Sequence, residues 1–364
     1  MKLLILTQKV DINDDILGFM HGWIKEFSKH CESVVAVCLQ KGEYDLPDNI
    51  KVLSLGKEVN NFQFSIFNFQ FFNKIKYLLK FYQFIWQEKG NYDTVFVHMN
   101  KEYVILGGLL WRIIGKKICL WYAHGYAPFS LKIAEKLAHI VFTSTKSGFR
   151  LPSKKVNVVG QGIDVDKFKV ESLKLKVNDK FKIITVGRIS PVKGYDILIK
   201  AIEILNKEGV NLKVNIVGGA GLFEQERYLS DLKKIVSEKR LERVINFVGA
   251  VANKDIINYL KSADLFVNMS STGSLDKAMV EAMASRLPIL TCNEAMKEVL
   301  GEFQDLLMYN KGDYKGLAQK ISMIRGMEAG EIENIGKKLR EIVKNNHSQE
   351  GLIKKIINIL NLPR

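Results

Sequence analysis

Short apolar runs of strand length alternate with helix-length segments along most of this 364-residue chain. The first half contains the strand-like runs KLLILT, SVVAVCLQ, IKVLSL, YDTVFVHMN, KICLWYAHG and HIVFTS. Strands that alternate with helices form parallel sheets covered by helices, because each parallel connection needs a crossover. The first half is therefore predicted to be a doubly wound α/β domain.

The alternation stops over residues 164–180, a charged stretch interpreted as a linker, and restarts at FKIITVG. We therefore predict two consecutive domains, residues 1–165 and 166–345. A C-terminal helix over residues 346–364 is expected to cross back to the first domain. Ligands of doubly wound sheets bind at the carboxyl ends of the strands, so we expect a site in the cleft between the two domains.

Composition narrows the class of protein. A hydrophobic content of 47% and a charged content of 26% are typical of a soluble globular protein. The N-terminal apolar run is too short for a signal peptide, and no run is long enough for a transmembrane helix. A cytoplasmic location is therefore expected. The four cysteines lack metal-site spacing, and Cys31 and Cys38 are predicted to be buried thiols.

The net charge of +15 is spread over both halves of the chain. It could serve solubility alone, an anionic ligand or an anionic membrane surface. The sequence shows no zinc finger, RNP-like strand or recognisable helix-turn-helix, so nucleic acid is not expected as a partner.

The loop VGRISPVKGYDIL follows the first strand of the second domain. Gly187 permits a tight turn of the backbone at the end of the strand. Arg188 and Lys193 precede a helix predicted to start near Tyr195. Two cations and free helix amides suit a pyrophosphate. The alternative is two solvated basic residues on a loop.

Three further loops follow strands in this half: VGGAGLFEQ, FVGAVANKDI and SSTGSLDKAMVEAMA. The last contains Glu281, in a helix predicted to begin at Lys277. A carboxylate there can accept hydrogen bonds from two hydroxyls, as a ribose offers. Its alternative role is to complement the dipole at the start of its helix.

In this order the four loops resemble the signature of retaining glycosyltransferases of the GT-B fold, close to glycosyltransferase family 4 (group 1). The matching pieces are VGR and KG within 186–194, IVGG.G at 216–221, FVG at 247–249, AD.FV..S at 263–270 and EAMA…P at 281–288. The resemblance is strong over about residues 160–300. It implies two Rossmann-like domains facing a central cleft, with a nucleotide-sugar bound by the second.

By this resemblance, Arg188 and Lys193 hold the diphosphate and act in catalysis together with His124. Glu281 takes the ribose hydroxyls, and the family's usual acid eight residues earlier is replaced by Gly273. This chain therefore departs from the family pattern at the position that would hold the hydroxyls of the donor sugar. The other donor-binding residues implied are Gly187, Gly219, Gly249, Ala250, Val251, Thr272, Ser274, Asp276 and Lys277.

In the first domain, His124 follows an apolar strand in WYAHGYA, where the family commonly has a histidine near the reacting centre. It could also be a simple loop residue. His98, in VFVHMN, is a similar candidate on the acceptor side. The segment after the first strand, TQKVDINDDILGF, is read as a loop that offers Lys9 and Asp11 to an acceptor.

Residues 61–86 form an aromatic segment with three lysines and no acid. One interpretation is a helix that packs into the core of the first domain. The other is an interfacial segment, with Phe72, Phe81 and Phe84 among its aromatic wedges, against anionic lipid. The second interpretation would make the protein peripheral to the inner face of the cell membrane and its acceptor a lipid-linked or nascent surface glycan.

The implied reaction moves a sugar from a nucleoside diphosphate, with a UDP-sugar favoured, to an acceptor hydroxyl with retention. The sequence shows no carboxylate pair placed for a covalent intermediate. No Asp-x-Asp motif follows a strand, so neither a metal nor another cofactor is required. Alternatives are a phosphorylase, a nucleotide-sugar epimerase or a non-catalytic nucleotide-sugar-binding protein. A dehydrogenase is disfavoured because Gly-x-Gly-x-x-Gly is absent after the first strand.

Overall fold

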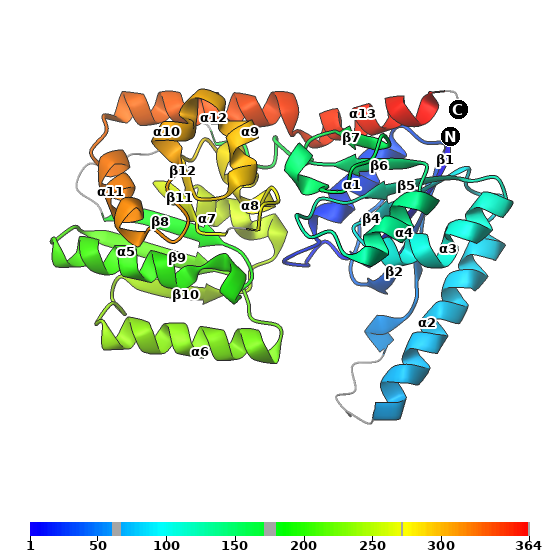
Figure 1. The fold of residues 1–364 in the computed structure, drawn as a ribbon, viewed down its shortest axis with the longest axis horizontal. Helices are drawn as coiled ribbons and strands as arrows, with labels where there is room; N and C mark the ends of the chain where they lie inside the picture. Colours follow the sequence, from blue (N-terminus) through cyan, green and yellow to red (C-terminus); the bar gives the residue numbers. More distant parts are fainter. Residues whose placement is uncertain (60–66, 171–179, 271, 363–364) are drawn as a thin grey trace. The chain divides into compact units, whose positions relative to one another are not determined.

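The computed structural model describes residues 1–59, 67–170, 180–270 and 272–362 (Figure 1). The chain divides into two compact units. Unit 1 comprises Met1–Gly160, Ala252–Lys254 and Leu352–Arg364, and unit 2 comprises Gln161–Val251 and Asp255–Gly351. The first unit is therefore built from separate stretches of the chain.

The sheet of unit 1 is parallel, with strand order β3-β2-β1-β4-β5-β6-β7. Its strands are β1 (Lys2–Val10), β2 (Ser33–Lys41), β3 (Ile50–Ser54), β4 (Thr94–His98), β5 (Lys117–Trp121), β6 (Ile140–Thr143) and β7 (Val156–Val158). The order reverses between β1 and β4, which makes that pair the topological switch point.

β1 is longer than predicted. It continues past Thr7 because Lys9 and Val10 stay in register with Gln40 and Lys41 of β2. Backbone pairing therefore extends the strand beyond its apolar run. The interpretation of this segment as a loop was wrong for Lys9, which lies in the strand.

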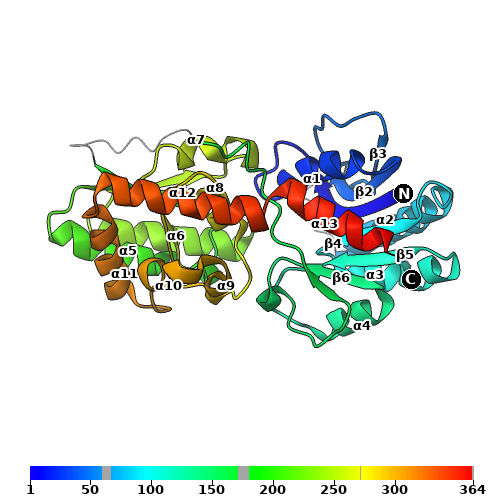
Figure 2. The same ribbon diagram turned by 90° about the horizontal axis from the view of Figure 1, so that it is seen from above.

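Helices cover both faces of this sheet. The core on one face includes side chains of α1 (Phe19–Ser28) and α13 (Gln349–Asn361), which lie side by side in Figure 2. The core on the other face includes side chains of α2 (Phe67–Gln87), α3 (Lys101–Ile113) and α4 (Phe129–Leu137). The buried cysteines include Cys31 and Cys38, as predicted.

The C-terminal helix α13 belongs to unit 1 from Leu352 onward. Its apolar residues recur at helical spacing, and Leu352, Ile353, Ile356 and Leu360 are all buried. They share a core cluster with Trp23 of α1 and with residues of the central strands. One face of the first sheet is thus covered by the last helix of the chain.

The sheet of unit 2 is parallel, with strand order β10-β9-β8-β11-β12. Its strands are β8 (Phe181–Val186), β9 (Leu212–Val217), β10 (Ile245–Gly249), β11 (Leu265–Asn268) and β12 (Ile289–Thr291). The order reverses between β8 and β11. The loops that leave these two strands therefore lie at the switch point.

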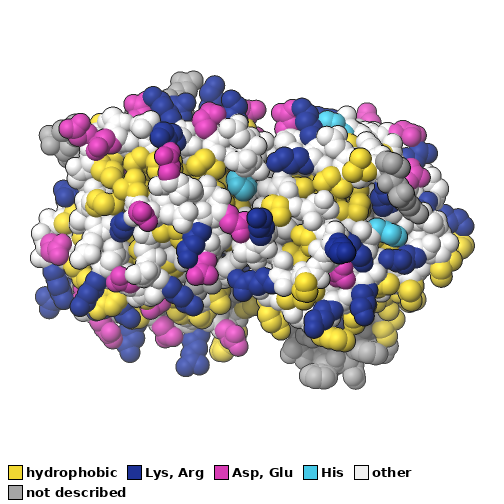
Figure 3. Space-filling view, turned by 45° about the horizontal axis from the view of Figure 1, so that its top comes forward, with side chains coloured by type: hydrophobic (Ala, Val, Ile, Leu, Met, Phe, Trp, Pro, Cys, Tyr) yellow, Lys and Arg dark blue, Asp and Glu magenta, His cyan; other side chains and the backbone are white. Residues whose placement is uncertain are grey.

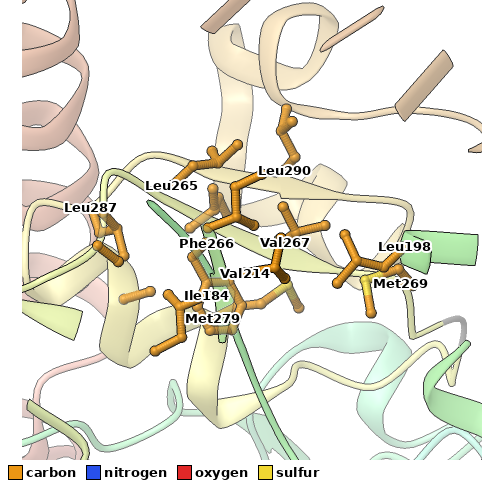
Figure 4. Close-up of a cluster of buried hydrophobic side chains, with 14 of the residues drawn as sticks. Ile184, Leu198, Val214, Leu265, Phe266, Val267, Met269, Met279, Leu287 and Leu290 are labelled. Carbon is orange, nitrogen blue, oxygen red and sulfur yellow. The ribbon is translucent and has the colours of Figure 1, made fainter. Parts of the chain in front are cut away.

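The helices of unit 2 are α5 (Tyr195–Lys207), α6 (Phe223–Glu238), α7 (Ile256–Leu260), α8 (Lys277–Ala284), α9 (Lys297–Leu300), α10 (Gln304–Leu307), α11 (Tyr314–Arg325) and α12 (Ala329–Asn346). α5 packs with α11, and α8 packs with α12. Figure 4 shows the core beneath them, where Phe266 of β11 lies among Ile184, Val214 and Met279. This core fixes the strand ends that carry the site.

Part of the predicted linker is packed rather than free. Phe168 and Val170 are buried in the core of unit 2. The Arg340 guanidinium donates to the carbonyls of Val165 (2.9 Å), Phe168 (3.4 Å) and Ala284. These bonds hold the start of the segment against α8 and α12, while residues 171–179 lie outside the described residues.

The aromatic segment forms α2, and part of the prediction for it lies outside the described residues. Nothing is described for residues 60–66 or for the side chain of Phe72. Phe81 is buried and packs on Tyr103 and Trp111, so its interpretation as a membrane wedge was wrong. Among the described residues, no helix is both long and apolar enough to cross a bilayer.

Candidate functional site

The switch point of the second sheet gathers polar side chains from two loops. Lys193, in the loop after β8, forms an ion pair with Asp276, in the loop after β11. Asn268, the last residue of β11, donates to the same carboxylate over 3.2 Å. Both partners of the ion pair are largely buried, with side chains 20% and 13% exposed. The pair therefore spans the crevice where doubly wound sheets bind ligands.

Glycine lets the neighbouring loops approach each other at this edge. A Cβ at Gly218 would lie 1.9 Å from the carbonyl oxygen of Gly187, which no side chain tolerates. The amide of Gly187 donates to Val217 (2.9 Å), and the amide of Ile189 donates to Gly219 (2.9 Å). The loop after β8 is thereby held against the loop after β9.

Asn268 is buried and held from several sides. Its backbone carbonyl accepts from the Tyr309 hydroxyl (3.0 Å), and its side-chain oxygen accepts from the amide of Ser270 (3.1 Å). The Thr291 hydroxyl donates to the same oxygen over 3.4 Å. The amide of Asn268 is thereby aimed at Asp276.

Arg188 lies in the same loop as Lys193, after β8, and is exposed. Over the described parts of the chain, its guanidinium has no ion pair and no side-chain hydrogen bond. The Tyr195 hydroxyl at the start of α5 donates to the Gly187 carbonyl over 2.7 Å, which fixes the backbone just before Arg188. Arg188 and Lys193 thus share the loop that leads into the amino end of α5. That this loop holds a diphosphate stays a prediction.

The TGSLDK loop has the backbone geometry of a tight turn. Gly273 has a φ of +68°, a left-handed conformation that an acidic side chain rarely adopts. The hydroxyls of Thr272 and Ser274 lie 3.2 Å apart, and the Asn293 amide donates to the Ser274 carbonyl over 2.8 Å. The glycine at position 273 therefore permits a backbone conformation that an acidic residue would rarely adopt.

Glu281 lies in α8, one turn after Lys277, and is only 4% exposed. The Lys277 ammonium donates to the Gly162 carbonyl over 3.1 Å. Burial lowers the pKa of Lys277 to about 8, with the nearby Lys167 charge adding to the shift and Glu281 opposing it. Burial also lowers the pKa of Lys167, again opposed by Glu281. The carboxylate assigned to ribose is thus buried and lies near two partly buried lysines.

The lowered pKa of Lys277 predicts a pH-dependent contribution to stability. Between pH 8 and 10.5 the folded protein has released this proton while the unfolded chain still binds it, so the free energy of unfolding rises with pH. Replacing Lys277 with Met removes this rise. Urea unfolding at pH 8 and at about pH 10 should therefore show the wild type gaining on Lys277→Met. It should show no such gain on Lys233→Met, a change at an exposed lysine of α6.

The two histidines of unit 1 differ in their surroundings. His124 is exposed after β5, and its Nδ1 accepts from the amide of Tyr126 over 3.0 Å. His98, at the end of β4, is 5% exposed, and its ring lies 5.7 Å from the rings of Phe19 and Trp23. His124 is therefore accessible to a substrate in unit 1, whereas His98 packs among aromatic rings.

Lys9, near the end of β1, pairs with acidic groups in the loop that follows the strand. The Lys9 ammonium lies 3.2 Å from Asp11 and 2.7 Å from Asp14. Burial opposes the charged form of both Lys9 and Asp14, but their contact outweighs it, so the pKa of Lys9 is raised and that of Asp14 is lowered. These groups form one charged cluster at the switch point of the first sheet.

Several residues at the site were not predicted. Asn268, Tyr195 and Asn293 hold its loops, and Lys167 adds a second cation beside Glu281. Asn268 could have been found from the sequence, because it is a polar residue near the end of the apolar strand DLFVNM. Lys167 lies within the stretch taken as a linker. Over the described residues, no three His, Cys, Asp or Glu side chains are grouped to hold a metal.

Comparisons with known proteins agree with this geometry. Residues 166–349 match the family described as glycosyl transferases group 1. The capsular polysaccharide biosynthesis glycosyltransferase CapM of Staphylococcus aureus is 27% identical over 243 residues, which cover 64% of this chain and 60% of CapM. The amylovoran biosynthesis glycosyltransferase AmsK of Erwinia amylovora is 28% identical over 185 residues, 49% of this chain and 44% of AmsK.

The fold of the whole chain is similar to that of Anabaena HepE, whose crystal structure is described in complex with UDP and glucose. The TM-score is 0.78 at 18% identity, with 100% of both chains covered. This chain spans about half the length of the curated relatives it matches. It belongs to the glycosyl transferases group 1 family, and the predicted GT-B fold class is confirmed.

Proposed function

We propose that this protein transfers a sugar from a nucleoside diphosphate sugar, with a UDP-sugar favoured, to an acceptor hydroxyl with retention of configuration. The observation that carries the proposal is the position of Lys193, which lies in the loop that leads into α5, pairs with Asp276 across the switch point of the second sheet and shares its loop with Arg188. Family membership supports it, and so do the names of CapM and AmsK, which describe polysaccharide synthesis. HepE, with the same fold, binds UDP and glucose.

Arg188 and Lys193 would stabilise the negative charge that develops on the leaving diphosphate. Glu281 would receive the ribose hydroxyls, and Gly249, Ala250 and Val251 would line the base. The donor sugar would lie against Thr272, Gly273, Ser274 and Asp276. In this proposal the leaving diphosphate helps to deprotonate the acceptor, and no metal is required. Turnover should therefore survive treatment with EDTA.

The acceptor is proposed to be a glycan or lipid-linked glycan of the cell surface, handled by a cytoplasmic enzyme that is peripheral to the inner face of the membrane. The names of CapM and AmsK support a glycan. His124 is the proposed catalytic group of unit 1, because it is exposed after β5. Lys9, Asp11 and His98 are the proposed acceptor-side residues, of which His98 has the least exposed position.

The first experiment is a thermal-shift panel of nucleoside diphosphates and their sugars. UDP and at least one UDP-sugar should raise the melting temperature of the wild type, and loss of the shift in Lys193→Ala would place binding at this site. The donor that gives the largest shift is then offered with candidate acceptors, and the anomeric configuration of the product is read by NMR. If nothing in the panel shifts the melting temperature, the proposal is wrong.

A non-catalytic nucleotide-sugar-binding protein is the second candidate. The observation that favours it is the left-handed Gly273 in place of the family's acid. It predicts donor binding without transfer or donor hydrolysis. Turnover that is lost in Arg188→Ala and Lys193→Ala would exclude it.

Asp276 should oppose diphosphate binding before a donor arrives. Its carboxylate forms an ion pair with the Lys193 ammonium. A diphosphate bound by Lys193 would therefore lie near the negative charge of Asp276. Changing Asp276 to Asn should therefore tighten UDP binding by about three- to tenfold, measured by calorimetry. Asp231→Asn, which removes an exposed carboxylate in the middle of α6, is the matched control and should leave UDP affinity unchanged. Weaker binding in Asp276→Asn would show that the carboxylate instead positions Lys193.

A further inference from the structure

The outer surfaces of α2, α3 and α4 carry large hydrophobic side chains in contact with solvent. Two of the most exposed on each helix are Leu79 (65%) and Trp86 (55%), Leu109 (66%) and Ile113 (82%), and Phe129 (75%) and Ile133 (38%). Within each helix they are four or seven residues apart, so each pair lies on one face. We call these six residues the α2–α4 apolar surface.

These exposed residues are additional to the ones that form the core. The same helices bury Phe81, Ile85, Trp111 and Leu131 against the first sheet. Each helix is therefore apolar on its outer face as well as its inner face. Core packing explains the inner residues only, and a surface with this much exposed apolar area on adjacent helices indicates a binding partner.

The three helices lie side by side, so their outer stripes are neighbours. The Tyr82 hydroxyl of α2 donates to the Leu106 carbonyl of α3 over 2.9 Å. The Arg112 guanidinium of α3 donates to the carbonyls of Leu137 (2.9 Å) and Lys136 (3.1 Å) at the end of α4. These bonds tie α2 to α3 and α3 to α4, and Figure 1 shows the helices in cyan to green on the first unit.

The surface is basic. Residues 73–137 contain 10 Lys and Arg and 4 Asp and Glu, which gives a net charge of +6. Three of the four acids form ion pairs, Glu88 with Lys51, Glu102 with Lys101 and Glu135 with Lys155, and Asp93 accepts from the amide of Lys2. Exposed cations such as Lys132 and Lys136 flank the apolar residues of α4, and Figure 3 shows hydrophobic and basic side chains interspersed over the lower right of the molecule.

We propose that the α2–α4 apolar surface docks this protein on an anionic lipid bilayer. A peripheral membrane protein needs apolar side chains that enter the bilayer interface and cations that attract anionic headgroups. The α2–α4 apolar surface supplies the first, and the lysines around it supply the second at the level of the lipid phosphates. A soluble protein partner would need a surface patch that is both acidic and apolar. An anionic bilayer supplies negative charge in its headgroups and apolar contact in its acyl chains over its whole surface. The inference rests on the peripheral location in the proposed function and names the surface that makes the contact, while its test does not require the transfer reaction.

The chain contains a natural probe for this contact. Of its four tryptophans, Trp23, Trp111 and Trp121 are at most 2% exposed, and Trp86 is 55% exposed. Lipids brominated on their acyl chains quench a tryptophan only at close range. Quenching of the wild type by anionic brominated vesicles, absent in Trp86→Phe, would place α2 in the bilayer.

The main test is co-sedimentation with vesicles of phosphatidylcholine alone or mixed with phosphatidylglycerol. We expect binding to the anionic vesicles, weaker binding to neutral ones and loss at high salt. The triple change Leu109→Ser, Ile113→Ser and Phe129→Ser should lower the partition coefficient at least tenfold, and Lys132→Glu with Lys136→Glu should do the same for anionic vesicles only. The control is Leu222→Ser with Phe223→Ser, two exposed residues of unit 2, which should bind like the wild type.

The melting temperature of every variant is measured first, so that a loss of binding is not confused with unfolding. UDP binding should be unchanged in the variants of α2, α3 and α4, which separates this inference from the donor site. Absence of wild-type binding to anionic vesicles overturns the proposal, and so does binding that the triple change leaves intact. Light scattering that shows a wild-type dimer, made monomeric by the triple change and with no vesicle binding, would assign the surface to self-association instead.

Discussion

Removing either cation at the switch point of the second sheet should nearly abolish sugar transfer. In Arg188→Ala and in Lys193→Ala, kcat/KM is expected to fall by about 10²–10³-fold. Each change removes a positioned charge that would stabilise the leaving diphosphate. The effect should appear mainly in kcat, because charge on the diphosphate increases as the bond to the sugar breaks.

Lys200→Ala is the matched control for this experiment. Lys200 lies on α5 and is exposed, with its ammonium 3.7 Å from Asp196 and 5.9 Å from the centroid of the Tyr314 ring. It carries the same charge close to the site but does not face it, so the variant should retain wild-type kinetics. Equal losses in Lys200→Ala and Lys193→Ala would show that net charge, and not a positioned ammonium, is responsible.

Gly218→Ala should damage both the stability of unit 2 and donor binding. The new Cβ would lie 1.9 Å from the Gly187 carbonyl, and Gly218 itself has a φ of +151°. The loop after β8 must move away, at a cost of about 1–3 kcal/mol in the free energy of unfolding. Arg188 moves with it, so UDP binding should weaken by at least tenfold.

Gly221→Ala tests whether this effect is local. Gly221 lies in the same loop, but no atom lies within 4 Å of its added Cβ. Denaturant unfolding and calorimetry should find this variant equal to the wild type. If Gly218→Ala also keeps wild-type UDP affinity, the contact between the two loops does not position Arg188.

Much of this fold could be predicted because its strongest patterns are local. Helix α5 spans Tyr195–Lys207, as predicted, since its apolar residues recur at helical spacing and Gly194 marks its start. Lys277 was likewise correctly predicted as the first residue of α8. In contrast, β1 runs past its apolar residues, and Phe168 is buried although it lies in a charged stretch. Those features depend on partners far away in the sequence.

In the site, too, local features could be predicted and contacts between distant residues could not. Loop order and residue type predicted that Arg188 and Lys193 would lie near each other, because both follow one strand. The pairing of Lys193 with Asp276 joins residues 83 positions apart and could not be predicted from spacing. The pattern that suggested a wedge at Phe81 was ambiguous, since α2 has apolar residues on its inner and outer faces. Only packing on Tyr103 and Trp111 distinguishes the two.

Helix α13 has a consequence for the order in which the chain folds. Domains usually fold in the order of synthesis, N-terminal first. Here the core on one face of the first sheet needs Leu352, Ile353 and Ile356, which a ribosome adds after all of unit 2. The second unit therefore has its whole sequence available before the first one does. We expect a chain that ends at Gly351, the last residue of unit 2, to carry a protease-resistant second unit and a first unit that is still open to cleavage.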